Sequence, residues 1–221
     1  FLVSCVMAAV EHHRGTGQGQ YIDFSQGEAS MQQLTPLLLD WTVNRRLWDR
    51  MGNRDHVHAP HAVFRSNGDD EWVAIVVTND HQWRALCELI GAPELTELGV
   101  GARRARQDEL EARIGVWTSE RSCTEAMTTC QSAGIPAHRV QNTDHCLDDP
   151  QLAHRNHFIE VGHGTQGTTT VENTRFGLSR TPANVVYGGP VWGEHNWEIL
   201  TEELGYDPDR IAELAIAEVL G

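Results

Sequence analysis

The chain has 221 residues, of which 40% are hydrophobic, and it carries a net charge of −14 at pH 7. This length and composition predict one domain or two small ones with an apolar core. The negative charge argues against nucleic acid or an anionic membrane as the main partner, but a local cluster of donors can still bind an anionic small molecule. The longest apolar runs, 1–10 and 72–77, are too short to span a bilayer.

Five cysteines are spread along the chain without a C-x-x-C pair. Because their number is odd, we expect buried free thiols rather than a disulfide framework. Free thiols are typical of a reducing compartment, so we expect a cytoplasmic protein. The cysteines are Cys5, Cys87, Cys123, Cys130 and Cys146.

Apolar residues recur at helical spacing near the start of the chain and predict a helix over residues 1–14. Gly15, Gly17 and Gly19 follow, and glycine ends helices and opens sharp turns. A β-type run, Tyr21–Phe24, predicts a short strand after that turn. A dinucleotide-binding fingerprint needs a strand before its glycines and a helix after them, so these glycines are not expected to hold a nucleotide. Because no capping residue precedes the first helix, we expect the chain to be the C-terminal part of a longer protein.

The second helical segment begins at Ser25, which can cap it together with Glu28 three residues later. The apolar pattern continues to Trp41, and Pro36 predicts a kink within it. A basic and polar run, Asn44–Arg54, follows and predicts a domain junction.

Residues 55–120 contain signals for two strands and several helices. Strands are predicted over 62–65 and 71–77, because an Asn-Gly turn joins two β-type runs. Asn79 or Asp80 is expected to cap a helix that stops at Gly91. A charged amphipathic helix is predicted over 102–120, and its basic cluster is interpreted as an ion-paired surface. Its apolar face carries Leu110, Ile114 and Trp117, and the basic cluster comprises Arg103, Arg104 and Arg106.

The last hundred residues combine capped helices with a hairpin. Ser122 is expected to cap a helix that ends at Gly134, and Asp149 to cap a short one. The runs 158–161 and 168–171 predict the hairpin. Two further helices are expected to begin near Gly193 and Asp207.

The stretch from Ala8 to Ala29 resembles the class III CoA-transferase family, which includes formyl-CoA and carnitine CoA-transferases and the related α-methylacyl-CoA racemases. Members carry a run of the form A-A-x-x-x-R-x-x-T-G-x-G-Q-x-[VI]-D-x-S-x-x-E-A. Here the arginine stands one place late, as Arg14. Three further stretches, 52–75, 134–140 and 190–205, resemble other motifs of the family. The residues that match the first motif are Ala8, Ala9, Thr16, Gly17, Gly19, Gln20, Ile22, Asp23, Ser25, Glu28 and Ala29.

The resemblance implies an α/β fold in three pieces. Residues 1–45 correspond to the C-terminal part of a Rossmann-like large domain, and residues 46–120 to a small α+β domain. Residues 121–221 correspond to a linker and a return to the large domain. Family members are interlocked homodimers, so the resemblance also implies a homodimer.

In the family, an aspartate attacks an acyl-CoA and becomes an aspartyl-CoA thioester, which passes coenzyme A to a second carboxylic acid. The resemblance thus implies a CoA-transferase, with coenzyme A as the acyl-CoA substrate. The aspartate falls before Phe1, so no catalytic residue is expected in this chain, and the chain alone is expected to be inactive. Asp23 is the nearest acid of the motif, but we expect it to hydrogen-bond the glycine turn or the next helix. Most CoA contacts also belong to the upstream half, so no CoA-binding residue is assigned.

The substrate loop of the family falls just before Ala59-Pro60. In formyl-CoA transferases this loop is rich in glycine and covers the reacting centre. The glycines are missing here, which disfavours oxalate and formyl-CoA as substrates. A histidine of this loop could bind a carboxylate, although loop histidines without a role are the simpler alternative. The candidate loop residues are Asp55, His56, Val57 and His58.

The histidine cluster of this segment also raises the question of a metal. His56, His58 and His61 lack the cysteine or acid partners at fixed spacing that zinc sites use, so no metal is expected.

Two other functions stay open. An α-methylacyl-CoA racemase-type isomerase would move a proton at the α-carbon with upstream residues. A non-catalytic fragment or partner subunit is the alternative from another class. The residues beside the upstream aspartate would separate transferase from racemase, and the acids that are exchanged are not specified by this sequence.

Overall fold

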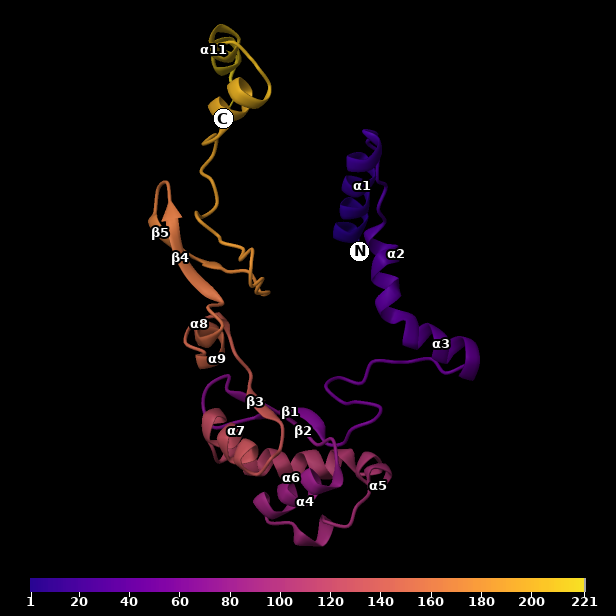
Figure 1. Cartoon of the computed structure of the whole chain (residues 1–221). Coiled ribbons are helices and arrows are strands. Elements are labelled where there is room, and N and C mark those ends of the chain that lie inside the picture. The colour runs from indigo at the N-terminus through magenta and orange to yellow at the C-terminus, as the bar shows by residue number, and fades with distance from the viewer. Residues whose placement is uncertain (221) are drawn as a thin grey trace. The chain divides into compact units, whose positions relative to one another are not determined.

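Figure 1 shows the computed structural model, which describes residues 1–220 as a mixed α/β structure. The described residues form two compact units. One consists of Phe1–Phe64, Ile75–Trp117 and Thr129–Pro136, and the other of Arg65–Ala74, Thr118–Thr128 and the residues from Ala137 onward. No helix within residues 1–220 has the length and apolar character needed to cross a membrane.

The first helix, α1 (Leu2–Thr16), ends as predicted at a glycine. Gly17 has φ 73° and its N–H donates to the carbonyl oxygen of His13, which is a left-handed C-cap. The predicted strand over Tyr21–Phe24 is wrong, because this segment pairs with no other strand of residues 1–220. Tyr21 is 90% exposed, so a β-type composition without a hydrogen-bonded neighbour leaves only an extended segment.

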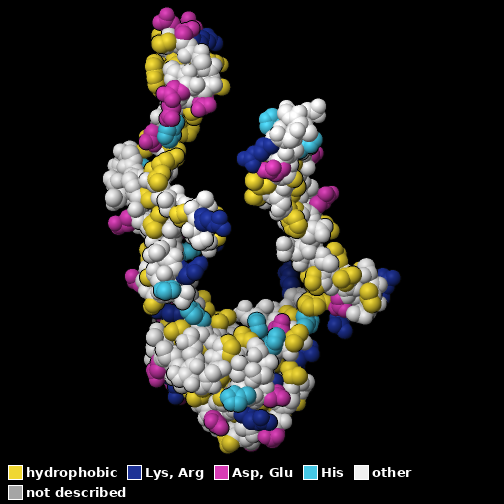
Figure 2. All heavy atoms as spheres, viewed as in Figure 1, with side chains coloured by type: hydrophobic (Ala, Val, Ile, Leu, Met, Phe, Trp, Pro, Cys, Tyr) yellow, Lys and Arg dark blue, Asp and Glu magenta, His cyan; other side chains and the backbone are white. Residues whose placement is uncertain are grey.

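The next segment confirms both the cap and the kink. Ser25 Oγ accepts a hydrogen bond from the Glu28 N–H at 3.2 Å and begins α2 (Gln26–Met31). A 3₁₀ turn, η1 (Gln32–Leu34), then separates α2 from α3 (Thr35–Asn44). Pro36 stands in the first turn of α3, where its missing N–H breaks no helical bond. None of α1, α2, η1 and α3 contains a buried residue, and hydrophobic side chains lie open along this segment in Figure 2.

A three-stranded sheet has the order β1 (His61–Arg65), β2 (Trp72–Val76), β3 (Ala137–Arg139). The strands predicted over 62–65 and 71–77 are therefore confirmed. Side chains of β2 and the residue after it alternate in burial, because successive residues point to opposite faces. The buried ones are Val73, Ile75 and Val77.

Helix α4 (Asp80–Leu89) begins as predicted at Asn79, whose side chain accepts from the Gln82 N–H at 2.9 Å. Its apolar face buries Trp83, Leu86 and Cys87 at i, i+3 and i+4 spacing. The Trp83 indole N–H donates to the Leu95 carbonyl oxygen at 2.8 Å, which joins α4 to the 3₁₀ turn η2 (Pro93–Leu95).

The predicted helix over 102–120 is divided into α5 (Val100–Ala105) and α6 (Gln107–Ser119). Arg106 interrupts it with φ −115°, although no glycine or proline marks the break. The Arg106 side chain instead binds Glu109, in the first turn of α6, at 2.8 and 2.9 Å. The predicted apolar face of α6 is confirmed, since Leu110, Ile114 and Trp117 are all buried.

The later elements agree largely with the sequence. Ser122 Oγ accepts from the Glu125 N–H at the start of α7 (Cys123–Ser132). Asp149 caps α9 (Pro150–His154), and the predicted hairpin is the antiparallel pair β4 (Phe158–His163) and β5 (Gly167–Glu172). The remaining elements are α8 (Thr143–Leu147), α10 (Asn196–Glu198), the π-helical η3 (Ile199–Glu203) and α11 (Pro208–Ile216).

Candidate active-site loop and pocket

The candidate substrate loop is folded around one carboxylate. Asp55 Oδ1 accepts from the N–H groups of Val57 and His58, both at 2.7 Å, and lies 3.0 Å from His58 Nδ1. A short acid that binds the backbone two and three residues on closes such a turn. The hydrogen bonds from the His58 and Val57 N–H groups lower the pKa of Asp55 to about 2. Asp55 is therefore a fixed anion that orients the His58 ring.

Arg54 anchors this loop to α6. Its Nε and Nη2 donate to the two carboxylate oxygens of Glu111 at 2.9 and 2.6 Å, and Nη2 also donates to Asp108 at 2.5 Å. The hydrogen bonds to Glu111 and Asp108 raise the pKa of the guanidinium above its ordinary value. A bidentate arginine–carboxylate pair sets direction as well as distance, so the start of the loop is held in place.

The three histidines of the segment have different surroundings. The His56 ring packs edge-on against Trp48 with 4.2 Å between centroids, and its buried Nε2 has no hydrogen-bond partner among residues 1–220. His61 Nδ1 lies 2.5 Å from the Asn53 carbonyl oxygen. His58 is bonded to Asp55 instead. Across residues 1–220 no three histidine, cysteine or acidic side chains form a group that could hold a metal ion.

A pocket of about 290 Å³ lies beside the loop, and we call it the Arg103 pocket. The loop provides two of its lining residues, the connection from β2 to α4 provides three, α4 provides one and α5 provides two. Asp55 and His56 do not line it; Asp55 accepts from the backbone of the loop and His56 contacts Trp48. The lining consists of Val57, His58, Val77, Thr78, Asn79, Asp80, Val100 and Arg103.

The sequence predicts that Arg103 lies on an ion-paired surface, and this prediction is wrong for Arg103. Arg103 is 2% exposed, not part of an exposed ion-paired surface, whereas the neighbouring Arg106 does pair with Glu109 as predicted. Arg103 Nη1 donates to Asp80 Oδ1 at 2.8 Å and to the Leu98 carbonyl oxygen at 3.0 Å. The guanidinium also lies 5.4 Å from the centroid of the Trp83 ring, a cation–π contact.

The described residues of this region lack a prepared thiol nucleophile. Burial raises the pKa of the Cys87 and Cys130 thiols to about 11, and burial together with Glu71 raises the pKa of Cys123. These thiols are protonated at neutral pH and react slowly. Asp23 is exposed and makes no hydrogen bond to any of residues 1–220, so its predicted bond to the glycine turn or the next helix is wrong.

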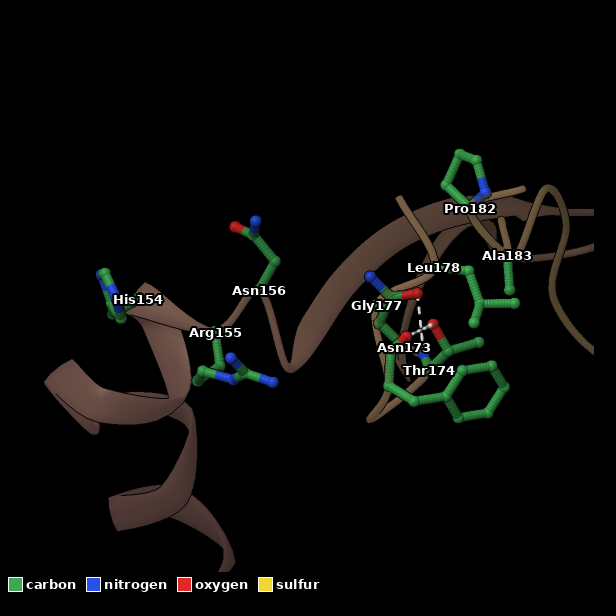
Figure 3. A pocket seen from close by; sticks show the side chains of 10 residues that line it. His154, Arg155, Asn156, Asn173, Thr174, Gly177, Leu178, Pro182 and Ala183 are labelled. Carbon is green, nitrogen blue, oxygen red and sulfur yellow. Dashed lines mark hydrogen bonds between the residues drawn. The ribbon is translucent and has the colours of Figure 1, made fainter. Parts of the chain in front are cut away.

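A second pocket, of about 360 Å³, follows α9. Figure 3 shows Arg155 and Asn156 on one side of it and Asn173 with Thr174 on the other. Its lining includes no carboxylate and no thiol. No predicted site residue lies there, whereas Val57 and His58 of the candidate loop line the Arg103 pocket. The Arg103 pocket is therefore the better candidate for the substrate site.

Known proteins resemble this chain in sequence and in fold. The model of CoA-transferase family III matches residues 1–196. The succinyl-CoA–D-citramalate CoA-transferase of Chloroflexus aurantiacus is 28% identical over 218 residues, which is 97% of this chain and 54% of that protein. The succinyl-CoA–L-malate CoA-transferase beta subunit of the same organism is 28% identical over 221 residues, again 97% of this chain and 54% of that protein.

A crystal structure gives the same picture at the level of the fold. A CaiB/BaiF family protein from Brucella suis superposes with a TM-score of 0.78 over 90% of this chain and 52% of that chain, at 24% sequence identity. The chain spans about half the length of the curated relatives it matches.

Proposed function

Because the chain belongs to CoA-transferase family III, we propose that the protein moves coenzyme A from an acyl-CoA to a free carboxylic acid. The family match over residues 1–196 carries the proposal, since that range includes the Asp55–His58 loop and the Arg103 pocket. The names of both Chloroflexus relatives contain succinyl-CoA, which makes succinyl-CoA the first donor to test.

The covalent carrier in this proposal is an aspartate outside residues 1–221. Its carboxylate attacks the acyl carbonyl and releases the CoA thiolate, which then attacks the aspartyl carbonyl and releases the first acid. The carboxylate of the second acid attacks the aspartyl thioester, and the released thiolate takes over its acyl group. Each step converts one activated acyl group into another. The free energy of the thioester is therefore conserved as long as water, which would hydrolyse it, is kept out.

The Asp55–His58 loop has the supporting role of a cover in this scheme. Asp55 holds the N–H groups of Val57 and His58, and Arg54 holds the loop start on α6. The first attack produces a mixed anhydride between the aspartate and the acyl group. A loop that is fixed at both points can stay over this anhydride and shield it from water. His58 is the loop residue that reaches the pocket with a hydrogen-bonding ring.

We also propose the assembly that the family resemblance implies. Residues 1–45 and 121–221 would complete a Rossmann-like large domain, residues 46–120 would be the small domain, and two chains would form an interlocked homodimer. Large exposed apolar side chains on α1 and α3 support a covering partner, because monomers rarely expose such continuous surface. Val3 is 75% exposed, Leu39 57% and Val43 74%.

The test is a transfer assay joined to trapping of the intermediate. The native-length protein is incubated with succinyl-CoA and a panel of acids, and then reduced with borohydride. We expect new acyl-CoA and one aspartate converted to its alcohol, which loses one oxygen and gains two hydrogens in the peptide mass.

Three outcomes would contradict the proposal. If no donor gives transfer and no aspartate is reduced, the proposed activity is refuted. A reduced aspartate within residues 1–221 would refute the placement of the carrier. Exchange of α-protons without transfer would favour the racemase instead.

A further inference from the structure

We propose that Arg103 binds the second carboxylate of a short dicarboxylic acid, presented either as the free acid or as its CoA thioester. This inference rests on the proposed function and names the substrate class for it. The wall of the Arg103 pocket combines one buried guanidinium with three valine side chains, and these suit a carboxylate and the methylene carbons beside it. The valines are Val57, Val77 and Val100.

Among residues 1–220, no group accepts a hydrogen bond from the Nε edge of the Arg103 guanidinium. Its hydrogen bonds to described residues, with Asp80 and with the Leu98 carbonyl oxygen, both leave from Nη1. Nε is buried and donates to none of residues 1–220. An unpaired buried donor is costly, so the pocket favours a ligand that accepts from this edge.

Arg54, in the same unit, shows which group fits such an edge. Its Nε and Nη2 donate side by side to the two oxygens of Glu111, at 2.9 and 2.6 Å. The planar fork of arginine matches a carboxylate in this bidentate way. A bound carboxylate would accept hydrogen bonds from Nε and Nη2 of Arg103, while Nη1 continues to donate to Asp80.

Thr78 and Asn79 of the pocket wall are engaged in the cap of α4, and His58 Nδ1 lies 3.0 Å from Asp55 Oδ1. The Thr78 N–H and hydroxyl both donate to Gln82 Oε1, at 2.8 and 2.9 Å. Asn79 Oδ1 accepts from the Gln82 N–H at 2.9 Å. Arg103 is therefore the lining residue whose charge is permanent and whose Nε is left for an anionic ligand.

Asp80 separates this proposal from a purely structural role of Arg103. If Arg103 only joins α5 to α4, Asp80 is its counter-ion, and Asp80→Asn should damage the protein much as loss of Arg103 does. If Arg103 binds substrate, Asp80 competes with the incoming carboxylate, and its neutralisation should tighten binding. The Asp80 side chain is 63% exposed, so Asp80→Asn is expected to fold.

The experiment compares succinate with butyrate as acceptors in the native-length protein, because both have four carbons and differ by one carboxylate. We expect Arg103→Gln to raise the KM for succinate about 10- to 100-fold and to leave the KM for butyrate within about threefold. Asp80→Asn should lower the KM for succinate. Arg104→Gln, the same change at an exposed neighbour on α5, is the matched control and should alter neither.

The outcomes distinguish the inference from the proposed function. A parallel rise in both KM values in Arg103→Gln, or a succinate KM that does not fall in Asp80→Asn, would overturn the role of Arg103 while transfer itself persists. If neither acid accepts CoA from any donor, the proposed function fails, and calorimetry of succinate with the wild type and Asp80→Asn still decides the inference. Tighter binding in Asp80→Asn supports it, and unchanged, weaker or absent binding refutes it.

Discussion

Replacing Glu111 by glutamine should release the Asp55–His58 loop from α6, whereas Asp108→Asn should change little. Both carboxylates accept from Arg54, Glu111 through two hydrogen bonds of 2.9 and 2.6 Å and Asp108 through one of 2.5 Å. The Glu111 side chain is 21% exposed and that of Asp108 is 91% exposed. One arginine thus has two acidic partners that differ mainly in their exposure to water.

The magnitude follows from that exposure. An exposed ion pair contributes about 0–1 kcal/mol, because water screens it and two long side chains lose freedom. A hydrogen bond to a charged group that is partly shielded contributes about 1.5–3 kcal/mol. We therefore expect Glu111→Gln to lower the free energy of unfolding by about 2 kcal/mol, and Asp108→Asn by less than about 0.5 kcal/mol.

Urea-induced unfolding of the two variants, with limited proteolysis between residues 45 and 60, measures both effects. Glu111→Gln should shift the midpoint to lower urea and expose the loop to cleavage. In an Arg54→Gln background the same Glu111→Gln change should cost almost nothing more, because the partner is already gone. Equal losses for Glu111→Gln and Asp108→Asn would show that burial does not set the strength of this anchor.

Trp83→Phe should lower the free energy of unfolding by about 1–3 kcal/mol, since the Leu95 carbonyl oxygen loses its buried donor; an unchanged urea midpoint would contradict this. Asn79→Ala should lower it by about 1 kcal/mol through loss of the α4 cap, and Asn79→Asp should restore most of it in thermal unfolding. Asp55 should remain ionised at pH 3 in a carbon-13 titration, because its pKa is about 2 in the folded protein against a usual 3.8. The stabilisation linked to Asp55 is full above about pH 4, is lost as the pH falls through 2, and should disappear in Asp55→Asn.

Helix starts were predicted well because capping is a local interaction. Ser25, Asn79 and Asp149 each accept a hydrogen bond from a backbone N–H two or three residues later, and the sequence contains both partners within one turn. The hairpin of β4 and β5 is likewise a contact between neighbours in the chain. Such elements need little information from elsewhere in the fold.

Elements that depend on distant partners were not predictable in this way. Tyr21–Phe24 has a strand-like composition, but a strand also needs a neighbour, and no described residue provides one. Arg103 stands in a basic cluster, yet Asp80, 23 residues away, and the Trp83 ring surround its guanidinium. No periodicity within the cluster distinguishes it from an exposed arginine.

The candidate site was predictable only in part for the same reason. Family resemblance identified the Asp55–His58 segment, and the Asp55 carboxylate does organise it. The pocket beside the loop requires three segments to meet, and nothing in the loop sequence points to α5. Its buried cation is therefore a property of the fold and not of the motif.

The order of strands in the three-stranded sheet has a consequence for synthesis of the protein. The Val76 N–H donates to the Pro136 carbonyl oxygen at 3.0 Å, and Pro136 follows 60 residues after Val76 in the chain. At about 5–20 residues per second, the nascent chain carries β2 with one unpaired edge for roughly 3–12 seconds. An open edge of this kind is a template for pairing with other chains. Translation speed between these points, and chaperone access during that interval, should therefore affect the yield of folded protein.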